Sequence, residues 1–246
     1  MPLGLAAAVA LSAWAVIATR LSPADIWRSL PQAGVIFSEL LTPNWSFAPR
    51  TFDAMLETVQ MAVIATTVGC AVALPVSFLA STVTSPDRMS LFLARGVMNV
   101  IRALPDLLYA MVFVAALSIG PLPGIAALIF FSIGVVAKLL SETVDGIDLG
   151  PIEAARAVGA GRIQTVWTAA LPQVLPHYVA YSLYVFELNI RASTVIGIVG
   201  AGGIGNVLNA QMKFFNYPNV AIVIIELFLL VFVIELVSIW LRRRLV

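Results

Sequence analysis

Long apolar runs with few charged residues recur along this chain, and they constrain its fold more than any other feature. An α-helix needs about 20 predominantly apolar residues to cross the hydrocarbon core of a bilayer. Hydrophobic residues make up 61% of the 246 residues and charged residues only 11%, a composition too apolar for a soluble domain of this size. We therefore predict an all-α integral membrane protein embedded in the lipid bilayer.

The apolar runs predict about six transmembrane helices. Their ranges are 3–19, 54–80, 104–119, 125–140, 178–199 and 220–241. The sequence Gly-Pro-Leu-Pro-Gly at 120–124 is expected to reverse the chain tightly between the third and fourth helices. No Lys or Arg precedes the first run, so we expect a retained helix rather than a cleaved signal peptide.

Residues 20–53 differ from the apolar runs on either side. They mix prolines with Trp and Phe, a pattern typical of a segment that lies along the membrane interface. We therefore divide the chain into an N-terminal part, residues 1–53, and a transmembrane core, residues 54–246. The first part holds one transmembrane helix and the interfacial segment.

The stretch 153–172 is a polar, Ala- and Gly-rich interruption between two apolar runs. Good helix formers occupy 153–158, glycines at 159 and 161 favour a sharp turn, and a second helix can run from Arg162 until Leu171-Pro172. Small side chains around the turn would let another protein approach the backbone closely. We predict a coupling loop, residues 141–176, whose tip docks onto a partner protein.

This spacing resembles the EAA loop of membrane permease subunits from binding-protein-dependent ABC importers. The matching residues are Glu153, Ala154, Ala155, Gly159, Leu171 and Pro172, and Ala169 stands where the family usually carries Ile. The resemblance implies a type I ABC importer permease fold, with 54–246 as the permease core. The residues expected to couple to the ATPase are Glu153, Ala154, Ala155, Arg156, Gly159, Gly161, Arg162, Leu171 and Pro172. The alternative is an ordinary Ala-rich amphipathic loop between two spans.

The distribution of basic residues predicts the orientation of the chain. Six spans place both termini on one side of the membrane, and Lys and Arg accumulate on the cytoplasmic side. Nine lie on the side of the coupling loop, namely Arg88, Arg95, Arg102, Lys138, Arg156, Arg162 and Arg242–Arg244; the others are Arg20, Arg28, Arg50, Lys213 and the embedded Arg191. We therefore expect a cytoplasmic coupling loop and C-terminus in a bacterial cell membrane. The arginines that follow the first span argue locally against this orientation.

A second run of residues indicates which branch of these permeases the chain resembles. The segment 187–205, together with Arg102-Ala-Leu-Pro105, resembles permeases of the phosphonate-importer branch and more loosely those of the methionine type. This resemblance implies a pair of permease subunits, identical or paralogous. It also implies two cytoplasmic ATPase subunits that bind ATP and Mg, and an external binding protein. The expected substrate is a phosphonate, phosphite or phosphate anion.

The same run contains Gly-Ala-Gly-Gly-Ile-Gly at 200–205, which matches the G-x-G-x-x-G pattern of dinucleotide sites. That interpretation needs a preceding strand, a following helix of a βαβ unit and an acidic residue about 20 positions on. A membrane helix precedes this run instead. We expect flexible or closely packed backbone, buried in protein or lining a wet cavity.

Ionisable residues within the predicted spans give an independent indication of function. Each costs about 2.5 to 3.5 kcal/mol on membrane-insertion scales, so it usually faces a cavity or a partner. Glu187 and Arg191 are spaced i, i+4 on one helix and can pair, either to fix helix packing or as part of a substrate path or gate. Glu226 and Glu235 have no basic residue one turn away, and we expect each to contact another helix or subunit.

The candidate residues of the path or gate are taken from the fifth span and the glycine run. They are Glu187, Asn189, Arg191, Ser193, Thr194, Gly200, Gly202, Gly203 and Gly205. An ion-coupled secondary transporter that uses Glu187, Arg191 and Glu226 as a relay is the alternative function, although it leaves the EAA loop unexplained.

Other functional classes find little support in the sequence. The chain has one His and one Cys, so we expect neither a catalytic constellation nor a metal site. No Walker A sequence is present, so ATP hydrolysis must come from another polypeptide and we expect no cofactor in this chain. The net charge of +1 gives no case for nucleic-acid binding.

Overall fold

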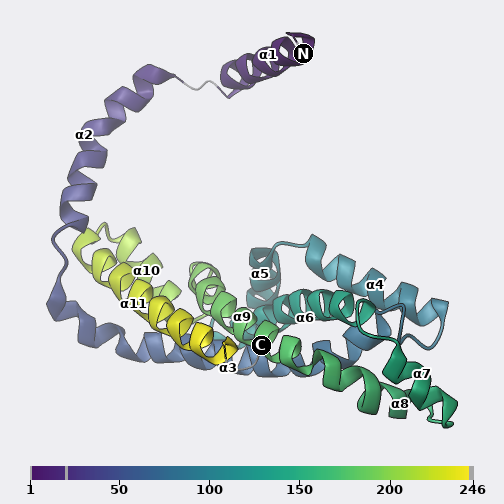
Figure 1. Cartoon of the computed structure of the whole chain (residues 1–246). Helices are drawn as coiled ribbons and strands as arrows, with labels where there is room; N and C mark the ends of the chain where they lie inside the picture. The colour runs from purple at the N-terminus through teal and green to yellow at the C-terminus, as the bar shows by residue number, and fades with distance from the viewer. Residues whose placement is uncertain (1, 20–21, 244–246) are drawn as a thin grey trace.

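The computed structural model describes residues 2–19 and 22–243, and every regular element within these ranges is helical (Figure 1). The elements follow the order α1 (Pro2–Ala18), α2 (Pro23–Leu40), the 3₁₀ turn η1 (Trp45–Phe47), α3 (Ala48–Leu79), α4 (Arg88–Ala103), α5 (Asp106–Leu117), α6 (Pro121–Asp145), α7 (Gly150–Ala157), α8 (Arg162–Thr165), the π-helical turn η2 (Val166–Ala170), α9 (Leu171–Gly197), α10 (Gly203–Lys213) and α11 (Tyr217–Arg242).

Three of the described helical segments are long and apolar enough to cross a membrane, namely Trp45–Leu79, Pro121–Asp145 and Tyr217–Arg242. They contain the second, fourth and sixth predicted spans. The first predicted span forms the short apolar helix α1. The fifth lies within α9, which has 27 residues but carries Glu187, Asn189 and Arg191. Length and composition alone therefore support fewer than the six spans predicted.

The third predicted span, 104–119, is shorter than expected, because only 106–117 form a helix, α5. The chain bends by 87° between α4 and α5, at Leu104 and Pro105, both of which have extended backbone. The ring of Pro105 disfavours helical backbone in the residue before it, so α4 ends at Ala103. At 12 residues, α5 is about 18 Å long, too short to cross a bilayer. Only the bent pair as a whole could form a span.

The tight reversal predicted at 120–124 is also shorter than expected. The turn lies at Ser118 and Gly120, which have φ values of 72° and 148°. Helix α6 already begins at Pro121, because proline suits the first helical turn. The remaining residues of the predicted reversal are therefore helical.

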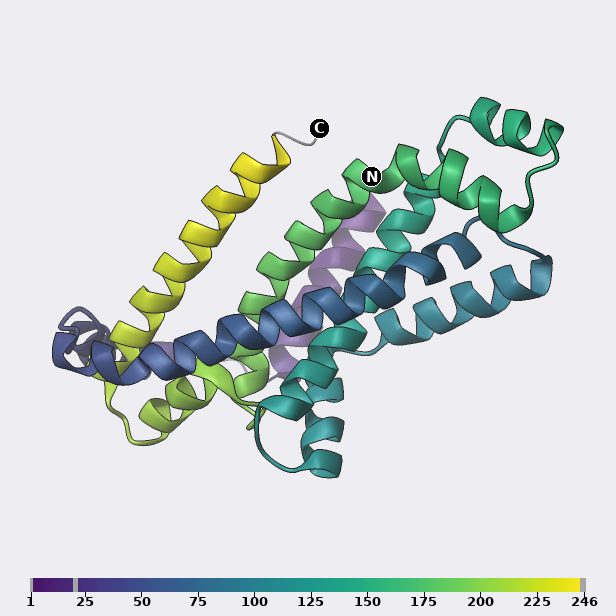
Figure 2. The same cartoon turned by 90° about the horizontal axis from the view of Figure 1, so that it is seen from below.

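Helices α3, α6 and α9 pack against one another at the centre of the molecule (Figure 2). Small residues let them approach closely: a Cβ added at Gly69 of α3 would collide with the Cβ of Ser132 in α6. The apolar core between them includes Met61, Leu128 and Ile196, each almost fully buried. Helices α7 and α8 lie at one end of this body and α10 at the other (Figure 2).

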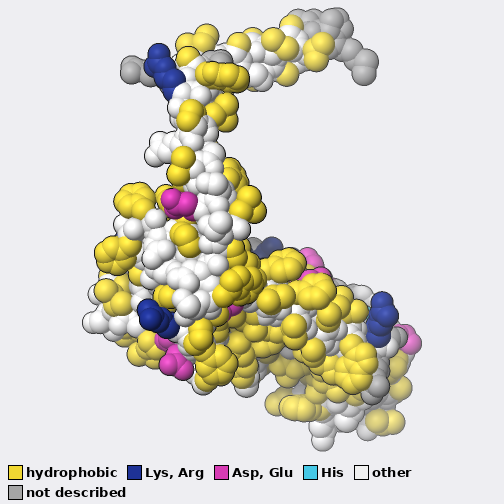
Figure 3. Space-filling view, turned by 90° about the vertical axis from the view of Figure 1, so that its left-hand side faces the viewer, with side chains coloured by type: hydrophobic (Ala, Val, Ile, Leu, Met, Phe, Trp, Pro, Cys, Tyr) yellow, Lys and Arg dark blue, Asp and Glu magenta, His cyan; other side chains and the backbone are white. Residues whose placement is uncertain are grey.

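The N-terminal helices α1 and α2 project away from this body (Figure 1). Residues 23–40 of the predicted interfacial segment form α2, which contacts α11, and residues 48–53 are already part of α3. Whether residues 20–53 lie along the membrane surface stays a prediction. Hydrophobic side chains cover much of the face seen in Figure 3, and charged ones are few, as expected for a surface in contact with lipid.

Candidate coupling loop and translocation path

The predicted coupling loop folds into a compact pair of short helices. Helix α7 ends at Ala157, Gly159 has a φ of 84°, and α8 starts at Arg162. Helices frequently end on such a left-handed glycine. The side chain of Gln164 accepts a hydrogen bond from the backbone N–H of Gly161 at 2.9 Å, which fixes the start of α8. The sharp turn predicted at 159–161 is therefore present.

A small apolar cluster attaches this helix pair to the rest of the chain. Ile152 of α7 is fully buried and packs with Ala169 and Ala170 of the π-helical turn. The small side chain at position 169 thus leaves room for Ile152. Gln173 adds a polar link, because its amide accepts from the N–H of Asp148 at 3.1 Å and donates to the Asp148 carbonyl at 3.2 Å.

The prediction that the second helix of the loop ends at Leu171-Pro172 is wrong. The chain stays helical from Arg162 through the π-helical turn into α9 and ends at Gly197. Pro172 lies directly after the π-helical turn, and the helix continues through it. The loop and the fifth predicted span therefore form one continuous helical run.

Most residues predicted to couple to a partner are exposed. Leu171 and Ala155 are half-buried; the exposed ones are Glu153, Ala154, Arg156, Gly159, Gly161, Arg162 and Pro172. A Cβ added at Gly159 would meet no heavy atom within 4 Å, so the tip of the loop is open. Among the described residues, the Glu153 side chain has neither a hydrogen bond nor an ion pair. Arg156 donates to the carbonyl of Val83 at 3.5 Å, and the other exposed groups are free for intermolecular contacts. The role of the loop in coupling stays a prediction.

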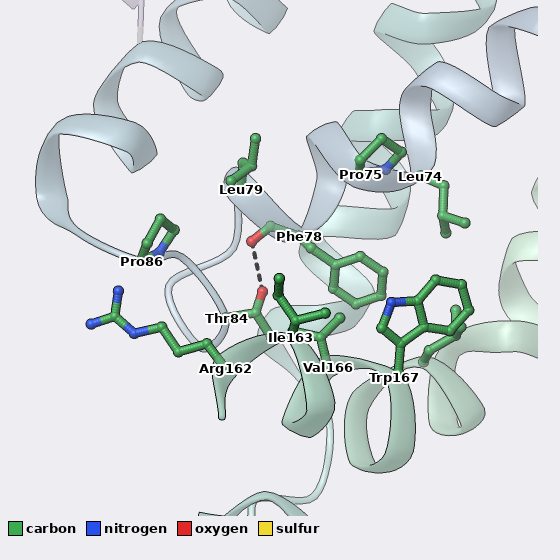
Figure 4. Close-up of a pocket in the computed structure, with 11 residues that line it drawn as sticks. Leu74, Pro75, Phe78, Leu79, Thr84, Pro86, Arg162, Ile163, Val166 and Trp167 are labelled. Atoms are coloured by element: carbon green, nitrogen blue, oxygen red, sulfur yellow. Dashed lines mark hydrogen bonds between the residues drawn. The ribbon is translucent and has the colours of Figure 1, made fainter. Parts of the chain in front are cut away.

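An apolar groove of about 550 Å³ separates the coupling loop from the end of α3 (Figure 4). Phe78 and Pro75 of α3 form one wall, and Ile163 and Trp167 form the other. The hydroxyl of Thr84 donates to the carbonyl of Phe78 at 2.7 Å and holds the linker after α3 in place. The exposed Trp167 ring therefore faces apolar side chains of α3 across the groove, where the loop joins the membrane helices.

In the predicted path, Glu187 and Arg191 form the expected i, i+4 ion pair. The Glu187 side chain is only 9% exposed, whereas that of Arg191 is 51% exposed. A second arginine was not anticipated: Nη2 of Arg242, at the end of α11, lies 3.8 Å from Oε2 of Glu187. The carboxylate is therefore held between two cations that come from two helices.

Asn189 is fully buried where α3, α6 and α9 meet. Its amide nitrogen donates to Oγ1 of Thr66 at 2.8 Å and to Oγ of Ser132 at 2.9 Å, and among the described residues its Oδ1 has no partner. Ser193 is also buried, and its hydroxyl donates to the carbonyl of Ile190 at 2.7 Å. Within this chain, Asn189 therefore joins three helices, the hydrogen bond of Ser193 stays within α9, and Thr194 is half-buried.

The glycine run at 200–205 was expected to be either flexible or closely packed, and the structure shows close packing. Gly200, Gly202 and Gly203 have positive φ values of 91°, 84° and 68°, which other residues rarely adopt. A Cβ on Gly205 would collide with the carbonyl oxygen of Thr194, so glycine is needed where α10 folds back onto α9. The N–H of Ile204 donates to Oγ1 of Thr58 at 2.8 Å and ties the run to α3.

The acidic residues of the last span differ from each other. Glu226 accepts a hydrogen bond from the Thr51 hydroxyl of α3 at 2.6 Å, which confirms its predicted contact with another helix. Glu235 is exposed and has no hydrogen bond or ion pair to the residues that the structure describes. Its predicted contact with another helix or subunit remains untested.

Comparison with known proteins places this arrangement in a family. Residues 73–246 match the family described as the inner membrane component of binding-protein-dependent transport systems. The chain belongs to this family. It is therefore a permease, the membrane-embedded and non-enzymatic component of such a transport system. Membership also implies partners, namely an ATPase and a substrate-binding protein.

Individual relatives support the assignment. The chain is 42% identical over 217 residues to the phosphate-import permease protein PhnE of Mycolicibacterium smegmatis, covering 88% of this chain but only 41% of that relative. It is 34% identical over 236 residues to the phosphite transport system permease protein PtxC of Stutzerimonas stutzeri, covering 96% of this chain and 85% of the relative.

A solved structure supports the fold. An inward-facing structure of the MetNI methionine ABC transporter contains a chain that this permease matches with a TM-score of 0.73 and 23% identity, over 82% of this chain and 99% of the other. The likeness confirms the predicted type I ABC importer permease fold. Nothing in these comparisons favours the ion-coupled secondary transporter.

Proposed function

We propose that this permease carries a phosphorus oxyanion, such as phosphonate, phosphite or phosphate, through an ATP-driven importer. The observation that carries the proposal is its identity of 34–42%, over most of this chain, to permeases named for phosphate and phosphite transport. The sequence resemblance to the phosphonate-importer branch adds phosphonate to the candidate substrates.

In the proposed complex, two permease subunits surround the translocation path and two cytoplasmic ATPase subunits bind ATP and Mg. An external binding protein delivers the anion. The accumulation of Lys and Arg on the side of the coupling loop supports a cytoplasmic loop and C-terminus in the bacterial cell membrane. ATP binding and hydrolysis move the loops, and the helices convert this movement into alternating access.

The exposed tip of the loop supports its role in coupling. Glu153 and Arg162 can form charge-assisted contacts at the edge of an interface, while the open space around Gly159 lets a partner approach the backbone. The burial of Ile152 against the helical run that leads into α9 gives the loop a firm base. Movement of the loop would therefore be transmitted directly to α9.

The substrate is tested by reconstitution. The permease, its ATPase and its binding protein are placed in proteoliposomes, and uptake of labelled methylphosphonate, phosphite and phosphate is measured. We expect ATP-dependent uptake of at least one anion that persists after ionophores collapse the ion gradients. Absence of uptake of all three anions, with binding protein present, would refute the proposal. The anion that the isolated binding protein retains identifies the preferred substrate.

The coupling role is tested with Gly159→Asp. Asp tolerates the left-handed backbone at this position better than most residues, but adds bulk and charge at the proposed interface. We expect uptake and transport-linked ATPase activity to fall while the protein still inserts. Gly146→Asp is the matched control, because Gly146 is also exposed but lies at the base of the loop, directly after α6, and has an ordinary φ of −103°. Wild-type coupling in Gly159→Asp would exclude this loop as the coupling element.

A further inference from the structure

The bend between α4 and α5 borders a cavity of about 280 Å³ whose lining is mostly apolar but includes three polar side chains. Arg102, Asp106 and Tyr109 line it from the bent pair, and Phe131 and Gly134 line it from α6. The phenol of Tyr109 donates to the carbonyl of Ile101 at 2.8 Å and so satisfies part of the interrupted backbone. The cavity therefore combines a cation with hydrogen-bonding groups in an otherwise apolar region.

The cavity lies beside the middle of α6. A Cβ added at Gly134 would lie 3.1 Å from Cγ of Arg102. Gly134 is about 20 Å along α6 from Pro121 and about 17 Å from Asp145, at 1.5 Å per residue. Since α6 can cross the membrane, the stem of Arg102 lies far from either end of the span.

Arg102 is exposed and, among the described residues, its side chain makes no ion pair or hydrogen bond. Two other arginines of the body are paired: Arg95 with Asp145 at 2.9 Å, and Arg191 with Glu187. A cation at membrane depth is costly unless it faces water or a partner. Arg102 therefore requires an anionic partner or water from outside the described chain.

A polar stripe connects this cavity to the end of the molecule that carries the coupling loop. Arg88, Arg95, Asn99 and Arg102 are separated by seven, four and three residues, which places them along one side of α4. The exposed apolar residues, including Val97 and Val100, occupy another side. Helix α4 thus presents a lipid-compatible face and, beside it, a polar stripe in which Arg95 is already paired with Asp145.

We propose that the cavity at the α4–α5 bend is a transient binding subsite for a phosphorus oxyanion, with Arg102 as its cationic contact. This proposal rests on the proposed import of such an anion. Tyr109 and the bend position the site, and Asp106 lies in the first turn of α5 with its carboxylate accepting the N–H of Leu107 at 2.9 Å. The negative charge of Asp106 weakens anion binding, which favours release along the stripe of α4.

A phosphate group could reach Arg102 either as the free anion or as a lipid headgroup, and thiol labelling separates these sources. Reporter cysteines at Ala103 and, as a matched lipid-facing control, at Val100 are introduced into a Cys70→Ser background. The complete transporter is studied in a maltoside detergent, with or without added phosphatidylglycerol. A thiol reagent that carries a sulfonate is expected to modify position 103 faster than position 100.

Protection identifies the ligand. Methylphosphonate should slow labelling at 103 when Arg102 is intact, and this protection should vanish in Arg102→Gln. Protection by phosphatidylglycerol but not by methylphosphonate would assign the site to a lipid and overturn the proposal. Equal labelling at 100 and 103, or equal protection with and without Arg102, would also overturn it.

Transport provides the second measurement. Arg102→Ala should lower uptake per folded transporter by roughly 10- to 100-fold, the effect of losing one charge-assisted contact, and Arg102→Lys should restore part of it. The isolated binding protein should retain the anion as before. Unchanged uptake in Arg102→Ala refutes the subsite while leaving the importer function intact. Failure of the wild-type transporter to import any phosphorus oxyanion refutes the proposed function instead.

Discussion

The two-arginine environment of Glu187 leads to a prediction that the i, i+4 pair alone would not make. Arg191→Ala leaves Glu187 with Arg242, and Arg242→Ala leaves it with Arg191. Each single variant should therefore retain a paired carboxylate. Removing both arginines leaves a carboxylate that is 9% exposed without a cation among the described residues.

The expected magnitudes follow from distance and exposure. Two unit charges 3.8 Å apart attract by about 4 kcal/mol at an effective dielectric constant of 20. The side chains of Arg191 and Arg242 are 51% and 31% exposed. Solvent screening and the entropy lost on ordering these side chains therefore reduce the expected loss of stability to about 1 kcal/mol for each single variant. An unpaired buried carboxylate costs about 3 to 5 kcal/mol. The loss of unfolding free energy in the double variant should therefore exceed the sum of the losses in the two single variants by about 1 to 3 kcal/mol.

The measurement is the free energy of unfolding in lipid bicelles for the wild type, both single variants and the double variant. Adding Glu187→Gln to the double variant removes the buried charge and should recover much of the lost stability, because a neutral amide is cheaper to bury. Additive losses in the double variant, or no recovery with Glu187→Gln, would show that the two arginines do not act on a shared carboxylate.

Three further predictions test packing and orientation. Gly205→Ala would place a Cβ 2.8 Å from the carbonyl carbon of Thr194, so we expect it to destabilise the fold by about 1 to 3 kcal/mol. Gly96→Ala, with no heavy atom within 4 Å, should stabilise the fold by about 0.5 to 1 kcal/mol, and equal melting temperatures of the two variants would contradict this packing. Asn189→Asp should lower folded yield more than Asn189→Ala, because the carboxylate is charged and buried, and a similar yield of the two would argue against that burial. A reporter Cys at Ala160, in a background without Cys70, should react with impermeant thiol reagents in inverted vesicles but not in intact cells, and labelling in intact cells would reverse the proposed orientation.

Features set by neighbouring residues could be predicted well from the sequence. The turn at Gly159 depends on a local backbone preference, and the Glu187–Arg191 pair depends on helical spacing, so both were visible as short patterns. The three helices that are long and apolar enough to cross a membrane also followed from composition. Helix ends were less certain, since Pro172 was interpreted as a stop although the helix continues through it.

Features set by distant parts of the chain could not be predicted in this way. Arg102 and Pro105 marked an irregular start for the third span, but the direction of α5 after the bend depends on its packing against α6. Asn189 was assigned to the path because it lies in the fifth span, within the run 187–205. Its two partners, Thr66 and Ser132, lie on other helices, and only the assembled bundle brings the three together.

The helical run from Arg162 to Gly197 gives the molecule a mechanical property. With 36 residues at 1.5 Å each, the run is about 54 Å long along its path, and it joins the coupling loop to the glycine-rich turn without a break in helical structure. Treated as a lever pivoting at one end, it converts a tilt of about 5° into a displacement of about 5 Å at the other. A π-helical turn at 166–170 lies near the driven end, and such turns are common at functional positions. If the proposed ATPase tilts this run about its coupling-loop end, the length alone produces a displacement of several ångströms at the glycine-rich turn, before any side chain changes its contacts.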